Sequence, residues 1–288
     1  MTDQQGSGMT VTSRIACCQL ALRIGESDAN RAAGLAAAAA AAADGATIVV
    51  LPELSASGYV FRDEAEARAL AEHADGPTAA GWARLARERG VTVVGGICEL
   101  GDDGLLYNSA LVVDASGLRA CYRKAHLWDA EKLVFTPGSG RPPVVETAGT
   151  ALAVVICYDV EFPEWVRLPA LAGAQLLCVP ANWPAQRRPV GERPMDVVRA
   201  QAAAAVNRMF IAVCDRVGRE RGVDWVGGSV IIDPDGWPLA GPEPGDHELT
   251  LAASCDLAVA TDKKTSERND VLADRRPDLY RGIAGEED

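Results

Sequence analysis

Short, continuously apolar segments alternate along this chain with longer segments in which apolar residues recur every three or four positions. The apolar segments are rich in β-branched residues and seven to nine residues long, as strands buried on both faces are. They lie at residues 14–22, 46–54, 91–97, 107–114, 151–159, 175–182, 209–215, 227–233 and 249–257. A further apolar segment, 118–124, follows a turn and predicts a hairpin with 107–114.

Segments with helical spacing lie between these strands, at residues 29–44, 63–73, 78–89, 162–173 and 194–207. The first is almost entirely alanine, the residue with the highest helix propensity, so we expect a helix despite the low complexity. Ser27 and Asp28 stand where they could cap its N-terminus. The alternation predicts an α/β fold whose mixed sheets carry helices on their faces.

The domain organisation follows from the absence of a long linker. No stretch of Gly, Ser or Pro in the sequence is long enough to separate two domains. We therefore expect a single domain over residues 13–280, between a flexible N-terminal tail at 1–12 and a C-terminal tail at 281–288.

Charge and composition narrow the function. The 288 residues carry 28 Lys and Arg against 40 Asp and Glu, a formal charge of −12, and 48% are hydrophobic, which is ordinary for a globular protein. The acidic excess would repel phosphate backbones and anionic lipids, so we expect no nucleic acid or membrane as partner. The polar start has no leader pattern, and we expect a cytoplasmic protein.

The cysteines do not predict a metal site. Eight are present, nearly all inside apolar segments, and the three histidines, His73, His126 and His247, are scattered. Structural zinc would need a C-x-x-C pair or grouped Cys and His. We expect neither metal, cofactor nor disulfide framework, and interpret seven thiols as small buried hydrophobes.

Three ionisable residues stand just where buried strands end: Glu53, Lys124 and Cys157. A strand end that opens into a loop presents a side chain to a pocket, although each residue alone could be a solvated side chain or one more buried thiol. Phosphate-loop, dinucleotide, serine-elbow and zincin motifs are absent from the sequence.

The segments LPELSASGY, YRKAHLWDAE and ICYDVEFPEW, which contain these residues, resemble the three catalytic blocks of the nitrilase superfamily of carbon–nitrogen hydrolases. The spacings, 124 − 53 = 71 and 157 − 124 = 33 residues, suit that family. YNSA, FTPG, VPANWP and GGSVIIDPDGWPL extend the resemblance over most of residues 14–262. It implies a four-layer αββα sandwich that pairs as an αββααββα dimer.

The roles that the resemblance implies agree with the chemistry of the residues. A free thiol is mostly protonated at neutral pH, so Cys157 needs a base, and Glu53 can take its proton and later pass it to ammonia. Lys124, helped by the Tyr158 backbone N–H, would stabilise the negative charge that develops on the carbonyl oxygen. Lys124 would also favour the thiolate by Coulomb attraction.

Other residues are expected to bind the substrate. Glu131 corresponds to the second active-site glutamate of the family and would help hold substrate and water, although Asp129 is a competing carboxylate in the same loop. Four more residues lie on loops beside the blocks and could line the pocket or pack under the loops: Tyr59, Trp128, Asn182 and Trp183.

His126 raises the alternative of a Cys–His peptidase or transferase. We interpret it as structural, because the papain-like cysteine motif is absent and Glu53 already supplies a base. A non-enzymatic scaffold with this fold is a second alternative, against which the intact Glu-Lys-Cys set argues.

The sequence after Cys157 suggests the reaction. CYDVEFPE resembles the block of short-chain and ω-amino amide hydrolases, so we expect a small aliphatic amide to be cleaved to carboxylate and ammonia through a thioester. Hydrolysis of an N-carbamoyl compound is the first alternative and nitrile hydrolysis the second. The nearby acids Asp159, Glu161 and Glu164 could bind a distal cation of the substrate or simply favour the following helix N-terminus.

The same helical segment, 162–173, bears on the oligomeric state. Trp165, Leu168 and Leu171 form an apolar stripe along it at i, i+3 and i+6. This stripe could lie in a homodimer interface, or in a higher homo-oligomer, and packing within the subunit would explain it equally well.

Overall fold

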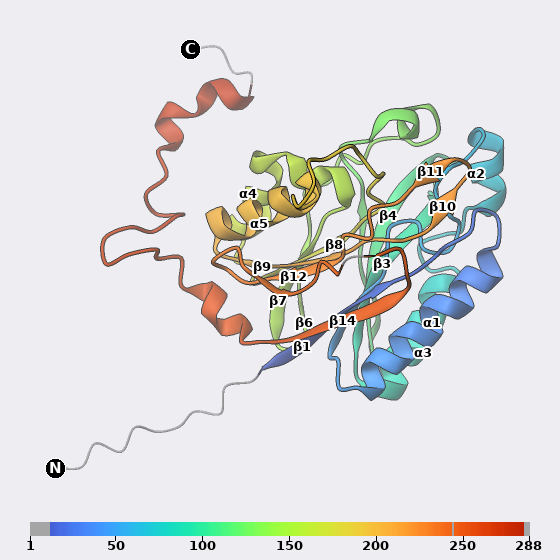
Figure 1. The fold of residues 1–288 in the computed structure, drawn as a ribbon, viewed down its shortest axis with the longest axis horizontal. Helices are drawn as coiled ribbons and strands as arrows, with labels where there is room; N and C mark the ends of the chain where they lie inside the picture. Colours follow the sequence, from blue (N-terminus) through green and yellow to red (C-terminus); the bar gives the residue numbers. More distant parts are fainter. Residues whose placement is uncertain (1–11, 244, 285–288) are drawn as a thin grey trace.

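Two six-stranded sheets make up the centre of the computed structural model, which describes residues 12–243 and 245–284 (Figure 1). The first sheet has the order β14-β1-β2-β3-β4-β5. Its strands are β1 (Ser13–Gln19), β2 (Ile48–Val50), β3 (Thr92–Leu100), β4 (Leu106–Asp114), β5 (Gly117–Arg123) and β14 (Leu249–Cys255). The strands β1, β2 and β3 run parallel and the other pairs are antiparallel, so the predicted mixed sheet is confirmed.

The second sheet has the order β13-β12-β9-β8-β7-β6 and is also mixed. Its strands are β6 (Val144–Thr147), β7 (Thr150–Val154), β8 (Leu176–Pro180), β9 (Phe210–Cys214), β12 (Val230–Ile232) and β13 (Pro238–Ala240). A separate two-stranded hairpin, β10 (Arg219–Glu220) with β11 (Val223–Asp224), projects from the loop after β9.

Helices form the outer layers on both sides of the two sheets (Figure 1). The helices α1 (Ser27–Ala43) and α3 (Pro77–Arg89) cover the first sheet, and α4 (Pro163–Leu171) and α5 (Met195–Asn207) cover the second. The predicted αββα arrangement is therefore confirmed for the subunit. The remaining helices are short: α2 (Glu64–Leu70) and the 3₁₀ helices η1 (Asp129–Leu133), η2 (Cys157–Glu161), η3 (Leu257–Thr261), η4 (Pro277–Leu279) and η5 (Arg281–Ala284).

The period-2 alternation of strand side chains distributes the apolar residues between two cores. In β1, Ile15 and Cys17 point into the core between the sheets, whereas Ala16 and Cys18 pack beneath α1 and α3. All four are fully buried. This explains why the sequence shows continuously apolar strands rather than strands with a polar face.

Several predicted boundaries were wrong. Ser27 and Asp28 lie inside the first turn of α1, whose N-cap is Glu26 without a side-chain hydrogen bond. The segment predicted as one strand over 151–159 ends at Val154 and continues into η2. The predicted N-terminal tail lies outside the described residues except for Thr12, and of the predicted C-terminal tail the structure describes only the turn η5.

Candidate active site

Glu53 lies in the turn that follows β2 and is wholly buried. Its Oε1 accepts hydrogen bonds from the Asn108 amide at 2.6 Å and from Lys124 Nζ at 2.7 Å. Its Oε2 is buried and has no hydrogen-bond partner among the described residues. One carboxylate oxygen is thus fixed, and the other is available to a thiol, a water or a substrate.

Lys124 stands at the end of β5, which runs parallel to β2, so both strand ends lie at the same edge of the sheet. Its ammonium is fully buried and donates to Glu53 at 2.7 Å and to Glu131 at 2.8 Å. Burial disfavours the charged ammonium, but the two carboxylates outweigh it and hold the pKa of Lys124 well above its usual value. The two carboxylates therefore favour the charged form of Lys124.

Glu131, in η1, completes this charged cluster. It is 5% exposed, and its Oε1 accepts hydrogen bonds from Lys124 and from the Tyr59 hydroxyl. The Trp128 backbone N–H donates to its Oε2 at 3.1 Å. The competing carboxylate Asp129 is exposed, so the structure brings Glu131 and not Asp129 to the lysine.

Cys157 is the first residue of η2, directly after the buried end of the β7 segment. It has a positive φ of 47°, and Asp159 fixes the turn by accepting a hydrogen bond from the Ile156 N–H at 3.1 Å. The thiol is 6% exposed and lies 3.9 Å from the Asn182 carbonyl oxygen. A residue other than glycine held at positive φ in a buried turn is typical of functional sites.

The pKa values of the thiol and the carboxylate are raised together. Burial raises the pKa of Cys157 well above its usual value, and the negative charge of Glu53 raises it further, while Lys124 lowers it. Burial likewise raises the pKa of Glu53 to about 7, against the opposing attraction of Lys124. Lys124 thus favours the thiolate, as expected, but its effect on the pKa of Cys157 is smaller than the opposing effect of burial.

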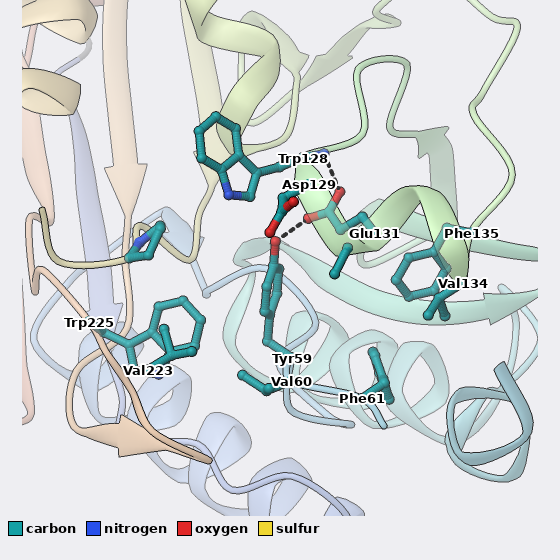
Figure 2. A pocket seen from close by; sticks show the side chains of 12 residues that line it. Tyr59, Val60, Phe61, Trp128, Asp129, Glu131, Val134, Phe135, Val223 and Trp225 are labelled. Atoms are coloured by element: carbon teal, nitrogen blue, oxygen red, sulfur yellow. Dashed lines mark hydrogen bonds between the residues drawn. The ribbon is translucent and has the colours of Figure 1, made fainter. Parts of the chain in front are cut away.

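The predicted lining residues surround the thiol. A small cavity of about 20 Å³ is lined by Cys157 together with Trp128, Tyr158, Asn182 and Trp183. Trp128 and Pro184 also line a neighbouring cavity of about 190 Å³. Tyr59 and Glu131 point toward one another in this second cavity (Figure 2). All nine site residues predicted from the sequence thus lie in one region, formed by loops from both sheets.

His126 is turned toward a different partner. Its Nδ1 lies 2.7 Å from Asp159 Oδ1, and its ring stacks on Phe162 with centroids 3.8 Å apart. Asp159 is fully buried and also accepts a hydrogen bond from the Tyr122 hydroxyl at 2.7 Å. These contacts support a structural role for His126 in holding the turn that carries the thiol.

The positions of Asp159, Glu161 and Glu164 do not support the alternative that they bind a distal cation of the substrate together. Asp159 is buried and hydrogen-bonded, as described, and Glu161 lies 3.0 Å from Arg199. Glu164 lines a separate groove along α4. Of these three residues only Glu161 reaches the cavity around the thiol, where Asp196 also lies and shares Arg199 with it.

Two buried side chains that sequence reasoning missed also hold the site. Asn108, in the YNSA segment, donates to Glu53, and its backbone carbonyl accepts from the Lys124 N–H at 2.8 Å. Asp215 accepts from the Trp183 N–H at 2.9 Å, and burial raises its pKa to about 7. Position at a strand end was the available signal for Asp215, and the YNSA motif was the signal for Asn108.

Two structural findings bear on the other function classes. No helix in the part of the chain that the structure describes is long and apolar enough to cross a membrane. Among residues 12–243 and 245–284 there is no group of three or more His, Cys, Asp or Glu side chains arranged to hold a metal ion.

A buried thiol, a carboxylate with a free oxygen and a fixed ammonium define the class of cysteine-dependent acyl-transfer sites. Residues 14–265 match the family described as Carbon-nitrogen hydrolase. The chain belongs to this family, within the nitrilase superfamily, as the sequence resemblance predicts.

Relatives support the same assignment. The chain is 34% identical to a protein of Pyrococcus abyssi named "Nitrilase", over 93% of this chain and 98% of the relative. It is 32% identical to the N-carbamoylputrescine amidase of Arabidopsis thaliana, over 83% and 84%. The solved amidase from Nesterenkonia sp. has 31% identity and a TM-score of 0.79, over 96% of this chain and 99% of that one. The prediction of an enzyme of the amidase type is confirmed.

Proposed function

We propose that this enzyme hydrolyses small neutral aliphatic amides to a carboxylate and ammonia through a thioester on Cys157. The observation that carries the proposal is the buried cluster of Glu53, Lys124 and Glu131, whose charges act on the pKa of the Cys157 thiol, with Glu53 Oε2 left without a partner in the described part of the chain. Structures of the Nesterenkonia amidase with acrylamide added to its active-site cysteine, and with butyramide bound, support the same chemistry here.

The first half-reaction acylates the thiol. Glu53 Oε2 takes the Sγ proton as sulfur forms a bond to the carbonyl carbon, and the carbonyl π electrons move onto oxygen. The Lys124 ammonium and the backbone N–H of Tyr158 stabilise that oxygen, and each such donor contributes about 3 kcal/mol to lowering the barrier. When the C–N bond breaks, Glu53 returns the proton to nitrogen, so that neutral ammonia leaves.

The second half-reaction releases the acid. Glu53, again ionised, takes a proton from a water molecule as the water oxygen attacks the thioester carbon. The C–S bond then breaks, and Glu53 returns the proton to sulfur. Glu131, fixed by Lys124 and Tyr59, faces the cavity where this water and the substrate nitrogen would be held. No step needs an oxidant, a reductant or a metal ion.

The cavity beside the cluster supports a neutral acyl group. Apolar or aromatic side chains form most of its wall, namely Tyr59, Phe61, Trp128, Val134, Phe135, Val223 and Trp225 (Figure 2). Buried apolar walls stabilise aliphatic groups and disfavour an unpaired ammonium. Arg199 pairs with both carboxylates at the cavity around the thiol, Glu161 and Asp196, so we expect no strong preference for a cationic substrate.

Ammonia release from a matched panel tests the proposal: butyramide, 5-aminopentanamide, N-carbamoylputrescine and butyronitrile. Butyramide should be the best substrate, followed by the carbamoyl compound and then the nitrile. Cys157→Ser should abolish turnover, while Cys121→Ser, which changes a thiol outside the site, should not. Full turnover by Cys157→Ser would contradict the mechanism, and a preference for 5-aminopentanamide that disappears in Glu161→Gln would contradict the neutral acyl group.

A homodimer and a cytoplasmic location complete the proposal. Leu171, Val206, Tyr280 and Ile283 are 40–63% exposed along the groove of α4 and the C-terminal segment, which supports pairing through this face. Sedimentation velocity should give twice the subunit mass, and a monomer mass would contradict the pairing.

The eight free cysteines favour a reducing compartment, and fractionation of the native host should find the protein in its cytoplasm rather than in a secreted fraction.

A further inference from the structure

Glu220, at the end of β10, is a buried carboxylate outside the proposed catalytic cluster. It is 4% exposed, and its Oε1 accepts hydrogen bonds from the backbone N–H groups of Tyr59 and Val60, both at 2.8 Å. Two successive backbone donors on one charged oxygen fix both the position and the direction of a chain. Glu220 therefore anchors the loop that begins at Glu53 and ends at Tyr59.

Arg216 supplies the countercharge. Its guanidinium is fully buried, with Nη2 3.1 Å from Glu220 Oε2, and it also donates to the Leu22 carbonyl oxygen. A buried ion pair contributes little net stability relative to apolar residues of the same volume. The pair of Arg216 and Glu220 is therefore better explained by the geometry that it imposes. That geometry is the placement of the Tyr59 loop.

Tyr59 is held from a second side by Trp225. The two rings meet edge to face with centroids 5.3 Å apart, and the Arg216 guanidinium lies 4.8 Å from the Trp225 ring centroid. Gly58 allows the close approach, because it has φ +83° and a Cβ there would lie 2.9 Å from Glu220 Oε2 and 2.4 Å from Ile24 Cα.

The free end of Tyr59 reaches the cluster. Its hydroxyl donates to Glu131 Oε1, the same oxygen that accepts from Lys124 Nζ at 2.8 Å. Catalytic groups need to be held within about 0.5 Å of their productive positions, and a displacement of about 1 Å can cost a hundredfold in rate. A shift of the Tyr59 backbone would therefore displace Glu131 and, through it, the Lys124 ammonium.

We propose that Glu220, held by Arg216, is a positioning residue for amide hydrolysis: it fixes Tyr59 so that the tyrosine hydroxyl orients Glu131 against Lys124. This inference rests on the proposed function, because it assigns Glu131 and Lys124 to the reaction. It gives the β10–β11 hairpin a role in catalysis, although Glu220 itself touches neither substrate nor reacting atoms.

A double-mutant cycle with Tyr59→Phe and Glu220→Gln tests the proposal, with kcat and KM measured on butyramide. Glutamine keeps a carbonyl oxygen for the two backbone donors but removes the charge facing Arg216. Each single variant should lower kcat about tenfold or more. The kcat of the double variant should be no more than about threefold below that of the less active single variant, because both changes act through the Tyr59 hydroxyl. Effects that multiply would overturn the proposal.

Glu66→Gln is the matched control. Glu66 lies 2.6 Å from Arg221, between β10 and β11, so it ties the same hairpin to the body from outside the site. This variant should keep kcat within about twofold. A loss equal to that of Glu220→Gln would mean that general anchoring of the hairpin is responsible, and the proposal would fail.

Two further outcomes are separable. If Glu220→Gln does not fold, Glu220→Asp takes its place, since it keeps the charge but is one methylene shorter, and the same non-additivity with Tyr59→Phe is required. If the wild-type enzyme hydrolyses no amide, or Cys157→Ser retains turnover, the proposed function fails. An active wild-type enzyme with multiplicative single effects overturns only the role of Glu220.

Discussion

Replacing Lys124 by methionine removes the one cation that two buried carboxylates share. Methionine has nearly the length of lysine but no charge, so the carboxylates of Glu53 and Glu131, 2.7 and 2.8 Å from Nζ in the wild type, would face an apolar thioether. Glu53 and Lys124 are fully buried and Glu131 nearly so, so water cannot take the place of the ammonium without rearrangement.

Breaking a buried ion pair by removing one partner costs about 3–5 kcal/mol of unfolding free energy. The cost depends on pH. Burial already raises the pKa of Glu53 to about 7, and loss of the cation raises it further. The folded variant then holds a proton that the unfolded chain releases near pH 4.5. The wild type loses stability with pH in the same way until its own Glu53 ionises near pH 7, so the deficit of the variant is nearly constant from pH 5 to 7. Above pH 7 the deficit widens by up to about 1.4 kcal/mol per pH unit.

The assay is urea unfolding followed by tryptophan fluorescence at pH 5, 6, 7 and 8, combined with ammonia release from butyramide. Lys124→Met should lose at least about a hundredfold in kcat because the oxyanion loses its donor. Cys157→Ala is the matched variant: it should be inactive but within about 1 kcal/mol of wild-type stability, since it leaves the ion cluster intact. A Lys124→Met protein as stable as the wild type at pH 8, or a deficit that shrinks as pH rises, would refute the reasoning.

Two further predictions concern the base and the histidine. Because Glu53 must be ionised to take the thiol proton and its pKa is about 7, kcat/KM for butyramide should fall about tenfold per pH unit below pH 7, and a flat pH profile from 5 to 8 would contradict this. His126→Ala should lower the acylation rate by no more than about tenfold, because the His126 ring bonds Asp159 rather than the thiol. Stopped-flow detection of ammonia release measures this rate. A loss as complete as that of Cys157→Ala would replace the Glu-Lys-Cys scheme by a Cys–His one.

The convergence of Glu53 and Lys124 could be predicted because it follows from strand direction. Each residue comes after a segment that the sequence identifies as a strand, and β2 and β5 end at the same edge of one sheet. The prediction that both strands are buried was wrong for β5, in which only Tyr122 is buried. The spacing of 71 residues between them carries no geometric information by itself. The resemblance to a family with known blocks supplied the pairing of the strands.

The conformation at Cys157 could not be predicted from local pattern. Residues 151–159 are as apolar as any strand in the chain, yet the strand ends at Val154. The turn depends on Asp159, whose carboxylate caps the Ile156 N–H and is held by Tyr122 and His126 from another part of the chain. The pattern of nine consecutive residues carries no information about these distant partners.

The same limit explains the missed contribution of the β10–β11 hairpin. The segment is short and polar, and Glu220 there is separated from Tyr59 by 161 residues. A polar residue in a short turn segment is predicted to be exposed to solvent unless it belongs to a known motif. A charge can be buried only where the rest of the fold supplies partners for it. For Glu220 these partners are Arg216 and two backbone amides.

The raised pKa values of Cys157 and Glu53 are compatible with catalysis because the reaction moves charge rather than creating it. Burial raises both pKa values, so its effects on the two ends of the proton transfer from sulfur to carboxylate oppose one another. Before transfer the negative charge is on Glu53, and afterwards it is on sulfur or on the oxyanion, while the charge of Lys124 stays fixed. The proposed mechanism is therefore compatible with a thiol that stays neutral until a carbonyl arrives, and it assigns the proton transfer to Glu53 Oε2, which has no hydrogen-bond partner among the described residues.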